Sequence, residues 1–166
     1  MKNNLRVGIA YDAHPLVAGR RLLLGGVEVP FDKGLLGWSD GDALTHAVID
    51  AMLGAAAMGD IGSHFPPGEA HLKDIASLAM LAQARDALAA GNWRVVNVDA
   101  IVVAVRPKLA EYIVPMRRLL SQTLGIAEGQ VSIKASTANG MGFAGRGEGM
   151  AVHAVVMIEG TENESI

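Results

Sequence analysis

The chain has 166 residues, of which 51% are apolar and 19% charged, and its net charge at pH 7 is −3. This composition excludes a disordered chain, which needs low hydrophobicity and high net charge. The slight acidity disfavours a nucleic-acid binder, because such a protein works through a clustered basic face. The absence of cysteine excludes a disulfide framework, a cysteine nucleophile and a thiolate metal site.

The sequence predicts one domain over residues 1–159, followed by a polar, frayed tail at 160–166. The N-terminus shows no signal-peptide pattern, and no window approaches about 18 uninterrupted apolar residues. We therefore expect a cytoplasmic protein without a membrane segment. The mean hydropathy of +0.30 is consistent with apolar surface buried between subunits, and equally with an alanine-rich core.

The first half of the chain predicts a strand, a hairpin and a helix. Residues 5–11 have a strand pattern, and residues 21–30 form a hairpin that turns at Gly25-Gly26. A helix is expected over about 42–58, capped by Ser39 or Asp40. Gly59-Asp60-Ile61-Gly62 ends this helix, and residues 65–68 must form a loop.

The second half predicts two more helices among three strands. A helix over 74–90 stops at Gly91, and a helix over about 109–124 contains Pro115, which marks a kink or a new start. The strands are expected at 95–105, 131–135 and 150–158, the first of them central because it is β-branched and almost uninterrupted. Strands and helices mix without strict alternation, which favours an α+β fold with a mixed sheet packed against helices.

Asp12 and His14 are the first candidates for chemistry. In an extended backbone, residues i and i+2 face the same side, so this carboxylate and this imidazole converge. Both are zinc ligands, and His46 on the first helix is the best third ligand for a site with an open fourth position. The pattern alone also fits a histidine satisfied within the core, so both interpretations stay open at this point.

Other polar segments have both a binding and a structural interpretation. The glycine-rich run 140–149 could bring backbone N–H groups and Arg146 to a phosphate, or it could be a turn in which Glu148 neutralises Arg146. Arg106-Pro107-Lys108 suits a phosphate at a strand end, or a solvated terminus. Asp60 could accept from a sugar hydroxyl, or simply follow a helix. His64 and His71 are expected in solvent, and His153 is expected to be structural.

Taken in order, these segments resemble the 2-C-methyl-D-erythritol 2,4-cyclodiphosphate synthase family. The resemblance spans residues 8–149, and strand 150–158 completes the expected end. Several unlinked motifs in one order are more specific than any single motif. They are Tyr11–His14, Leu24–Val27, Lys33–Leu36, Ser39–Asp42, Asp50–Gly62, Phe65-Pro66, Asn97–Asp99, Pro107-Lys108, Lys134–Thr137 and Gly142–Gly149.

The resemblance implies a homotrimer around a central β-lined axis, with active sites at the subunit interfaces. It implies one zinc ion per subunit on Asp12, His14 and His46, and a second divalent ion, Mg or Mn. The substrate would be the cytidine diphosphate compound 4-diphosphocytidyl-2-C-methyl-D-erythritol 2-phosphate, whose 2-phosphate attacks the β-phosphorus and releases CMP. Neither nucleic acid nor membrane is an expected partner.

The resemblance also assigns individual roles. Thr137 would be catalytic and, with Ser136, would contact the phosphates. Asp60, Ile61 and Gly62 would bind the erythritol part, while Phe143 and Arg146 would line the trimer axis, where an isoprenoid diphosphate can bind. The cytidine pocket would be bordered by Ala104, Pro107 and Lys108, and substrate contacts would also come from Asp12, Ala13, His14, Ser39 and Phe65.

Two positions depart from the family pattern. The family usually has a histidine directly before Ser39, where this chain has Trp38, whose indole can stack or donate its N–H but cannot ligate a metal. The family usually has an acidic metal ligand where this chain has Asn139, which should hold a second ion more weakly. The acidic loop after Phe65-Pro66 has also lost carboxylates.

Three hypotheses follow from these observations. The leading one is an active cyclase, slow or specialised. The second is a catalytically weak or inactive zinc-containing trimer of the same fold that binds a cytidine nucleotide or an isoprenoid diphosphate. The third is an alanine-rich structural trimer, which predicts no stoichiometric zinc.

Overall fold

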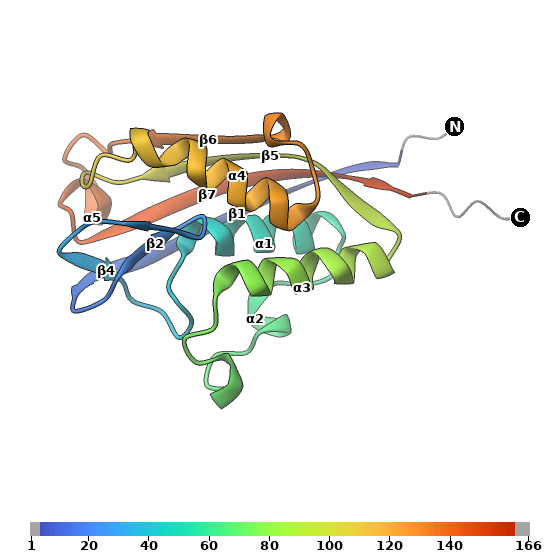
Figure 1. Ribbon diagram of the computed structural model, residues 1–166, viewed down its shortest axis with the longest axis horizontal. Helices are drawn as coiled ribbons and strands as arrows, with labels where there is room; N and C mark the ends of the chain where they lie inside the picture. The colour runs from blue at the N-terminus through green and yellow to red at the C-terminus, as the bar shows by residue number, and fades with distance from the viewer. Residues whose placement is uncertain (1–3, 162–166) are drawn as a thin grey trace, which may run out of the picture.

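A five-stranded mixed sheet runs the length of the molecule (Figure 1). The computed structural model describes residues 4–161. The central strand β7 pairs antiparallel with β1 on one side and with β5 on the other, while β5 pairs parallel with β6. The prediction of an α+β fold with a mixed sheet is therefore confirmed. Across the sheet the strands are β4 (Lys33–Leu35), β1 (Leu5–Ala18), β7 (Gly149–Gly160), β5 (Trp93–Val103) and β6 (Val131–Ser136).

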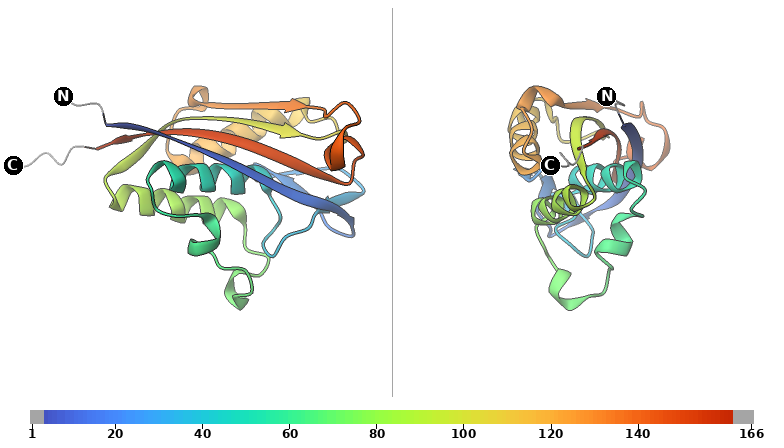
Figure 2. Two further views of the ribbon diagram at one scale, coloured as in Figure 1. Left: turned by 180° about the vertical axis from the view of Figure 1, so that it is seen from behind. Right: turned by 90° about the vertical axis from the view of Figure 1, so that its right-hand side faces the viewer.

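Helices cover one face of this sheet and leave the other face open (Figure 2). The three long helices are α1 (Ala43–Ala55), α3 (Ser77–Ala90) and α4 (Ile113–Leu124). The β2–β3 hairpin turns at Gly25-Gly26 as predicted. The remaining elements are β2 (Leu22–Leu24), β3 (Val27–Val29), α2 (Ile61–His64), α5 (Gly142–Gly145) and the 3₁₀ turns η1 (Ala70–Leu72), η2 (Ala110–Tyr112) and η3 (Glu128–Gln130).

Helix α1 packs very closely on β1, and this contact positions the candidate ligands. A Cβ atom added at Gly8 would lie 2.0 Å from the carbonyl oxygen of Ala51, so only glycine fits between the strand and the helix. Asp42 caps the start of the helix, because its carboxylate accepts from the N–H of Thr45 at 3.0 Å. The expected cap at Ser39 or Asp40 was wrong, because Asp42 alone reaches the first turn and the hairpin N–H groups.

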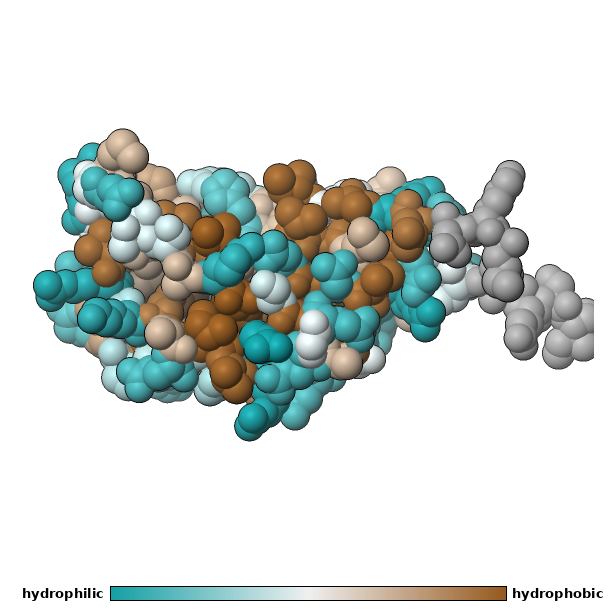
Figure 3. All heavy atoms as spheres, turned by 90° about the horizontal axis from the view of Figure 1, so that it is seen from above, coloured by the Kyte–Doolittle hydropathy of each residue, from teal (hydrophilic) through white to brown (hydrophobic). Residues whose placement is uncertain are grey.

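Side chains alternate along β7 between the helices and the open face. One set is fully buried against the helices: Met150, Val152, Ala154, Val156 and Ile158. The open face carries Ile9 and Tyr11 of β1 and Val155 of β7, all exposed in the single chain. Seen from above in Figure 3, apolar side chains gather along the middle of the molecule. Because apolar side chains stand on both faces of these strands, the pattern is typical of a sheet buried on both faces, yet only one face is covered within the chain.

Several predicted ends of strands and helices were wrong, because contacts with distant segments set these ends and the local sequence does not show such contacts. Strand β1 continues to Ala18, where pairing with β4 extends it beyond the predicted 5–11. Pro115 lies in the first turn of α4, so the new start was the correct alternative. Gly160 still belongs to β7, and the N–H of Thr161 donates to the carbonyl of Asn92, so the predicted fraying does not begin at 160. The rest of that tail, 162–166, lies outside the described residues.

Within residues 4–161, none of the helices combines the length and the apolar character needed to cross a bilayer.

Candidate metal centre

The three predicted ligands meet at one point between β1 and α1. Asp12 and His14 lie on β1, where they pair with Val152 and Met150 of β7, and His46 lies on the first turn of α1. One ligand atom from each of the three side chains lies within 4.8 Å of the other two. The hypothesis that His46 joins the Asp-x-His pair is therefore confirmed as geometry.

The separations between the ligand atoms suit a zinc ion. The Nε2 atom of His14 lies 2.9 Å from Oδ2 of Asp12, and Nδ1 of His46 lies 3.3 Å from the same oxygen. The two imidazole nitrogens are 3.4 Å apart. Tetrahedral zinc with bonds of about 2.0–2.1 Å requires its ligand atoms to be about 3.3 Å apart. Two nitrogens and one oxygen also form a donor set that zinc accepts in catalytic sites with an open position.

Hydrogen bonds on the far side of each ring orient the two imidazoles. The Nδ1 atom of His14 bonds the carbonyl of Leu36, so this nitrogen carries the proton and Nε2 faces the centre. The Nε2 atom of His46 lies 3.0 Å from the hydroxyl of Ser39, so Nδ1 faces the centre. Each ring thus presents a lone pair to the same point.

The centre is strongly polarised even without a metal ion. Burial alone would raise the pKa of the Asp12 carboxyl, but hydrogen bonds from His14 and His46 outweigh burial and hold this pKa well below its ordinary value. Burial alone would lower the pKa of His14, but the bond to Asp12 and its negative charge raise this pKa above 6.5. A cation among these groups is therefore stabilised.

A pocket of about 240 Å³ opens beside the triad. Its apolar wall continues from the metal ligands to the α2–η1 segment. Of the predicted substrate contacts, Asp12, His14, Ser39, Ile61, Gly62 and Phe65 line this pocket. Asp60 is exposed and caps α2 by accepting from the N–H of Ser63 at 2.8 Å, and its contact with a sugar hydroxyl stays a prediction.

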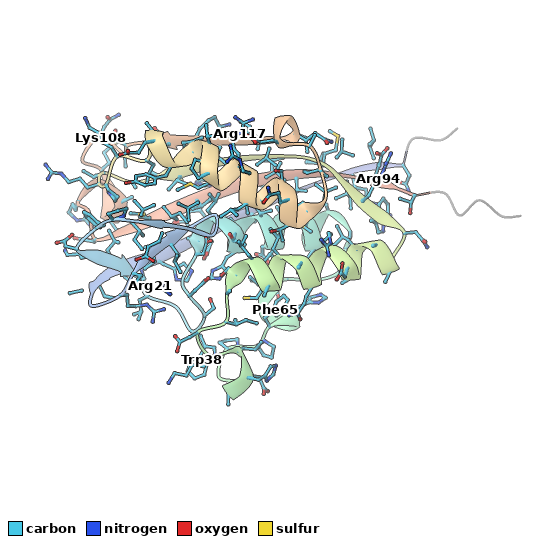
Figure 4. The ribbon with its side chains drawn as sticks, viewed as in Figure 1. Arg21, Trp38, Phe65, Arg94, Lys108 and Arg117 are labelled. Carbon is cyan, nitrogen blue, oxygen red and sulfur yellow. The ribbon has the colours of Figure 1, made fainter. Side chains whose placement is uncertain are left out.

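Trp38 lines the same pocket and connects two of its loops. Its indole N–H donates to the carbonyl of Glu69 at 3.1 Å, and its own carbonyl accepts from the N–H of Asp74 at 3.0 Å. Figure 4 shows Trp38 and Phe65 in the same region of the molecule. A bond from the indole N–H to a phosphate oxygen stays a prediction, and it would have to replace the bond to the carbonyl of Glu69.

The predicted cytidine and phosphate residues form a second pocket of about 730 Å³. Figure 4 shows Lys108 far from Trp38 and Phe65, because it follows β5 and lies near the start of α4. The structure thus brings the predicted cytidine and phosphate residues together, but it keeps them apart from the triad. The predicted residues in the second pocket are Ala104, Pro107, Lys108, Ser136 and Thr137.

The glycine-rich run contains α5 and an ion pair. Both guanidinium contacts of Arg146 go to the carboxylate of Glu148, at 2.7 and 3.0 Å, so the predicted ion pair within the turn is present, while an anion at Arg146 stays a prediction. Phe143 lines another pocket together with Ala13 and His14. Asn139 is exposed, and its Oδ1 accepts from the hydroxyl of Thr137 at 3.1 Å.

Three polar residues at the site, Asp40, Asp50 and Ser77, were not singled out for chemistry from the sequence. Asp50 lines the metal pocket and accepts from the N–H of Ile61 at 2.7 Å. Ser77 lies 2.9 Å from Nε2 of His46, and its hydroxyl also bonds Asp40. The position of Asp50 four residues after His46 signals a shared helix face, whereas no local pattern connects Ser77 with His46.

His64 and His71 are exposed as predicted, and His153 lies in β7 beside Tyr11.

Comparisons with known proteins agree with this geometry. The model of the YgbB family matches residues 5–159. A 2-C-methyl-D-erythritol 2,4-cyclodiphosphate synthase of Syntrophomonas wolfei is 54% identical over 155 residues, which are 93% of this chain and 99% of that protein. An IspF structure from Plasmodium falciparum, a complex with CDP, has a TM-score of 0.84 and 30% identity, covering 98% of this chain and 100% of that one. The bifunctional IspDF of Campylobacter jejuni has a TM-score of 0.93 and 36% identity over 97% of this chain and 44% of its own.

Proposed function

Because the chain belongs to the YgbB family of 2-C-methyl-D-erythritol 2,4-cyclodiphosphate synthases, we propose that it cyclises 4-diphosphocytidyl-2-C-methyl-D-erythritol 2-phosphate. An oxygen of the 2-phosphate attacks the β-phosphorus. The bond between the β-phosphorus and the bridging oxygen breaks, and CMP leaves with that oxygen. The product is the 2,4-cyclodiphosphate, and the reaction is a phosphorus–oxygen lyase step in isoprenoid precursor synthesis.

The triad beside the pocket is the observation that carries this proposal. Asp12, His14 and His46 would hold zinc, which supplies Lewis-acid polarisation of phosphoryl oxygens when it is bound. Phosphoryl transfer needs in-line positioning and charge neutralisation more than a protein nucleophile. The pocket supplies positioning, because the apolar wall at Ile61 and Phe65 suits the methyl-erythritol part and excludes water.

The two pockets favour an assembly in which subunits share each site. The triad pocket has no residue in common with the pocket at Lys108 and Thr137. The substrate carries its cytidine and its erythritol at opposite ends of one diphosphate. We therefore propose a homotrimer in which the open face of the sheet is buried around the axis, and the second pocket comes from a neighbouring subunit. In this proposal Ser136 and Thr137 contact the phosphates.

The two departures from the family pattern affect the rate in this proposal. Trp38 cannot accept a proton or a charge, so it contributes to the shape of the pocket and not to the chemistry. Asn139 offers a neutral oxygen to Mg or Mn, whose affinity should then be low. An isoprenoid diphosphate near Arg146 stays a prediction, and it would have to displace Glu148 from the guanidinium.

Phosphorus NMR of the substrate with the purified protein tests the proposed reaction. With zinc and Mn or Mg, the protein should convert the diphosphate signals to those of the cyclic product and release one CMP per substrate. The His46→Ala variant should remain folded but lose both zinc and conversion. Tight CDP binding without any conversion by the unaltered protein would favour the binding-protein hypothesis, and an absence of stoichiometric zinc would favour the structural one.

A further inference from the structure

His46 has two hydroxyl neighbours on the side away from the triad. Its Nε2 atom lies 2.9 Å from Oγ of Ser77 and 3.0 Å from Oγ of Ser39. All three side chains are buried, and Ser77, the first residue of α3, is not exposed at all. When Nδ1 gives its lone pair to a metal ion, Nε2 carries the only proton of the ring. One N–H group therefore faces two possible acceptors.

The two serines differ in which group accepts the proton of each hydroxyl. The hydroxyl of Ser77 bonds the carboxylate of Asp40, and a carboxylate only accepts, so Ser77 donates there and keeps its lone pairs for His46. The carboxylate is itself held by the main chain, since it accepts from the N–H of Ser77 at 2.8 Å and from the N–H of Asp42 at 3.2 Å. A carboxylate behind a ligand histidine orients the ring and makes it a more basic ligand.

Ser39 is placed differently. Among the described residues its Oγ meets the N–H of His46 and, at 3.4 Å, the N–H of Gly41, and both of these groups are donors. The hydroxyl proton of Ser39 is therefore not used by these contacts. Ser39 lines the pocket, whereas Ser77 does not. A phosphate oxygen of the substrate can accept the proton of Ser39 without disturbing the bond between His46 and Ser77.

We propose that Ser77 and Asp40 are positioning residues that orient His46 toward the metal, so that the hydroxyl of Ser39 remains available to the substrate. The relay runs from the carboxylate of Asp40 through the hydroxyl of Ser77 to Nε2 of His46. It joins the start of α3 to the start of α1, so the packing of two helices fixes the direction of a ligand. The inference rests on the proposed function only in that zinc occupies the triad.

Zinc affinity measured by competition with a chromophoric chelator tests this assignment without any turnover. The Ser77→Ala variant should bind zinc about 10–100-fold more weakly than the unaltered protein. The Ser121→Ala variant is the matched control, because Ser121 is as deeply buried on α4 but donates to the carbonyl of Arg118. Its zinc affinity should not change. The rise in melting temperature on adding zinc should shrink in parallel for Ser77→Ala.

The Ser39→Ala variant separates the two hydroxyls. It should keep zinc affinity close to that of the unaltered protein while the KM for the substrate rises. Unchanged zinc affinity in Ser77→Ala, or an equal loss in Ser39→Ala, would overturn the assignment. If Ser77→Ala does not fold by circular dichroism, Asp40→Asn replaces it, with the same expected loss and the same overturning result. Failure of the unaltered protein to bind zinc would instead contradict the proposed function, so the two failures are distinguishable.

Discussion

A single carboxylate oxygen, Oδ2 of Asp12, is the acceptor that both imidazoles of the triad share. Without a metal ion, this oxygen attracts a proton to the ring of His14, which is why the pKa of His14 lies above 6.5 and that of Asp12 below 3.8. The same attraction serves a divalent cation when the rings are neutral. Proton and metal therefore compete for one centre.

These pKa directions predict how the stability of the metal-free protein depends on pH. The lowered pKa of Asp12 contributes stability above pH 3.8, which is lost as pH falls through the lowered value. The raised pKa of His14 contributes stability below pH 6.5, which is lost as pH rises through the raised value. The contribution is therefore largest between these limits. Chemical denaturation of chelated protein at about pH 5.5 and 8.5 should show this loss at the higher pH, and His14→Asn should flatten it. An unchanged loss in His14→Asn would contradict the account.

Trp38 and Asn139 give a second prediction at the scale of single residues. Replacing them by the residues that the family usually has, Trp38→His and Asn139→Asp, should raise kcat, because each change restores a group that can take a charge or hold a cation. Trp38→Phe is the matched control, since it keeps an aromatic wall but loses the N–H bond to Glu69. Steady-state rates of CMP release measure the effect. Unchanged or lower rates would show that the pocket is adapted to its own residues.

Among the elements, the contact between β1 and α1 sets the geometry of the centre, because two ligands lie on the strand and the third on the helix. The Gly8→Ala variant should lower the free energy of unfolding by about 3 kcal/mol or more, since its Cβ would meet the backbone of Ala51. It should also weaken zinc binding by moving His46 away from Asp12. Gly54→Ala, on the exposed side of α1 with open space around it, should instead stabilise by about 0.5 kcal/mol. Equal effects of the two substitutions, read from denaturation curves, would contradict this role of Gly8.

Most elements were predictable because their signals are local. The β-branched run of β5, the Gly25-Gly26 turn and the stop at Gly91 are read directly from the residues. The missed elements depend on distant contacts: β4 has only three residues and exists through its pairing with β1, and α2 is a single turn capped by Asp60. Prediction of the triad required one assumption beyond the local pattern, namely that His46 lies next to Asp12 in the fold. Ser77 was out of reach because its contact with His46 comes from the packing of two helices.

For the whole molecule, the open face of the sheet is the feature that one chain does not explain. Ile9 is 74% exposed on this face, where it lies near Tyr11 and pairs with Val155 of β7. A charge there should prevent burial of the face, so Ile9→Asp should convert the proposed trimer to monomers. Light scattering after gel filtration measures the mass. Gln122→Asp adds the same charge on α4, on the helical layer, and should leave the mass unchanged. A trimeric Ile9→Asp protein would place the interface elsewhere.

The proposed division of the substrate site between two pockets leads to the most direct test of the account. His46→Ala removes the metal from one pocket, and Thr137→Ala damages the other pocket. Each variant alone should be inactive. Co-expressed in equal amounts, they should form mixed trimers that release CMP at about a quarter of the unaltered rate, because one interface in four then combines two intact halves. A mixture that stays at the background of the separate variants would contradict a shared metal-dependent site.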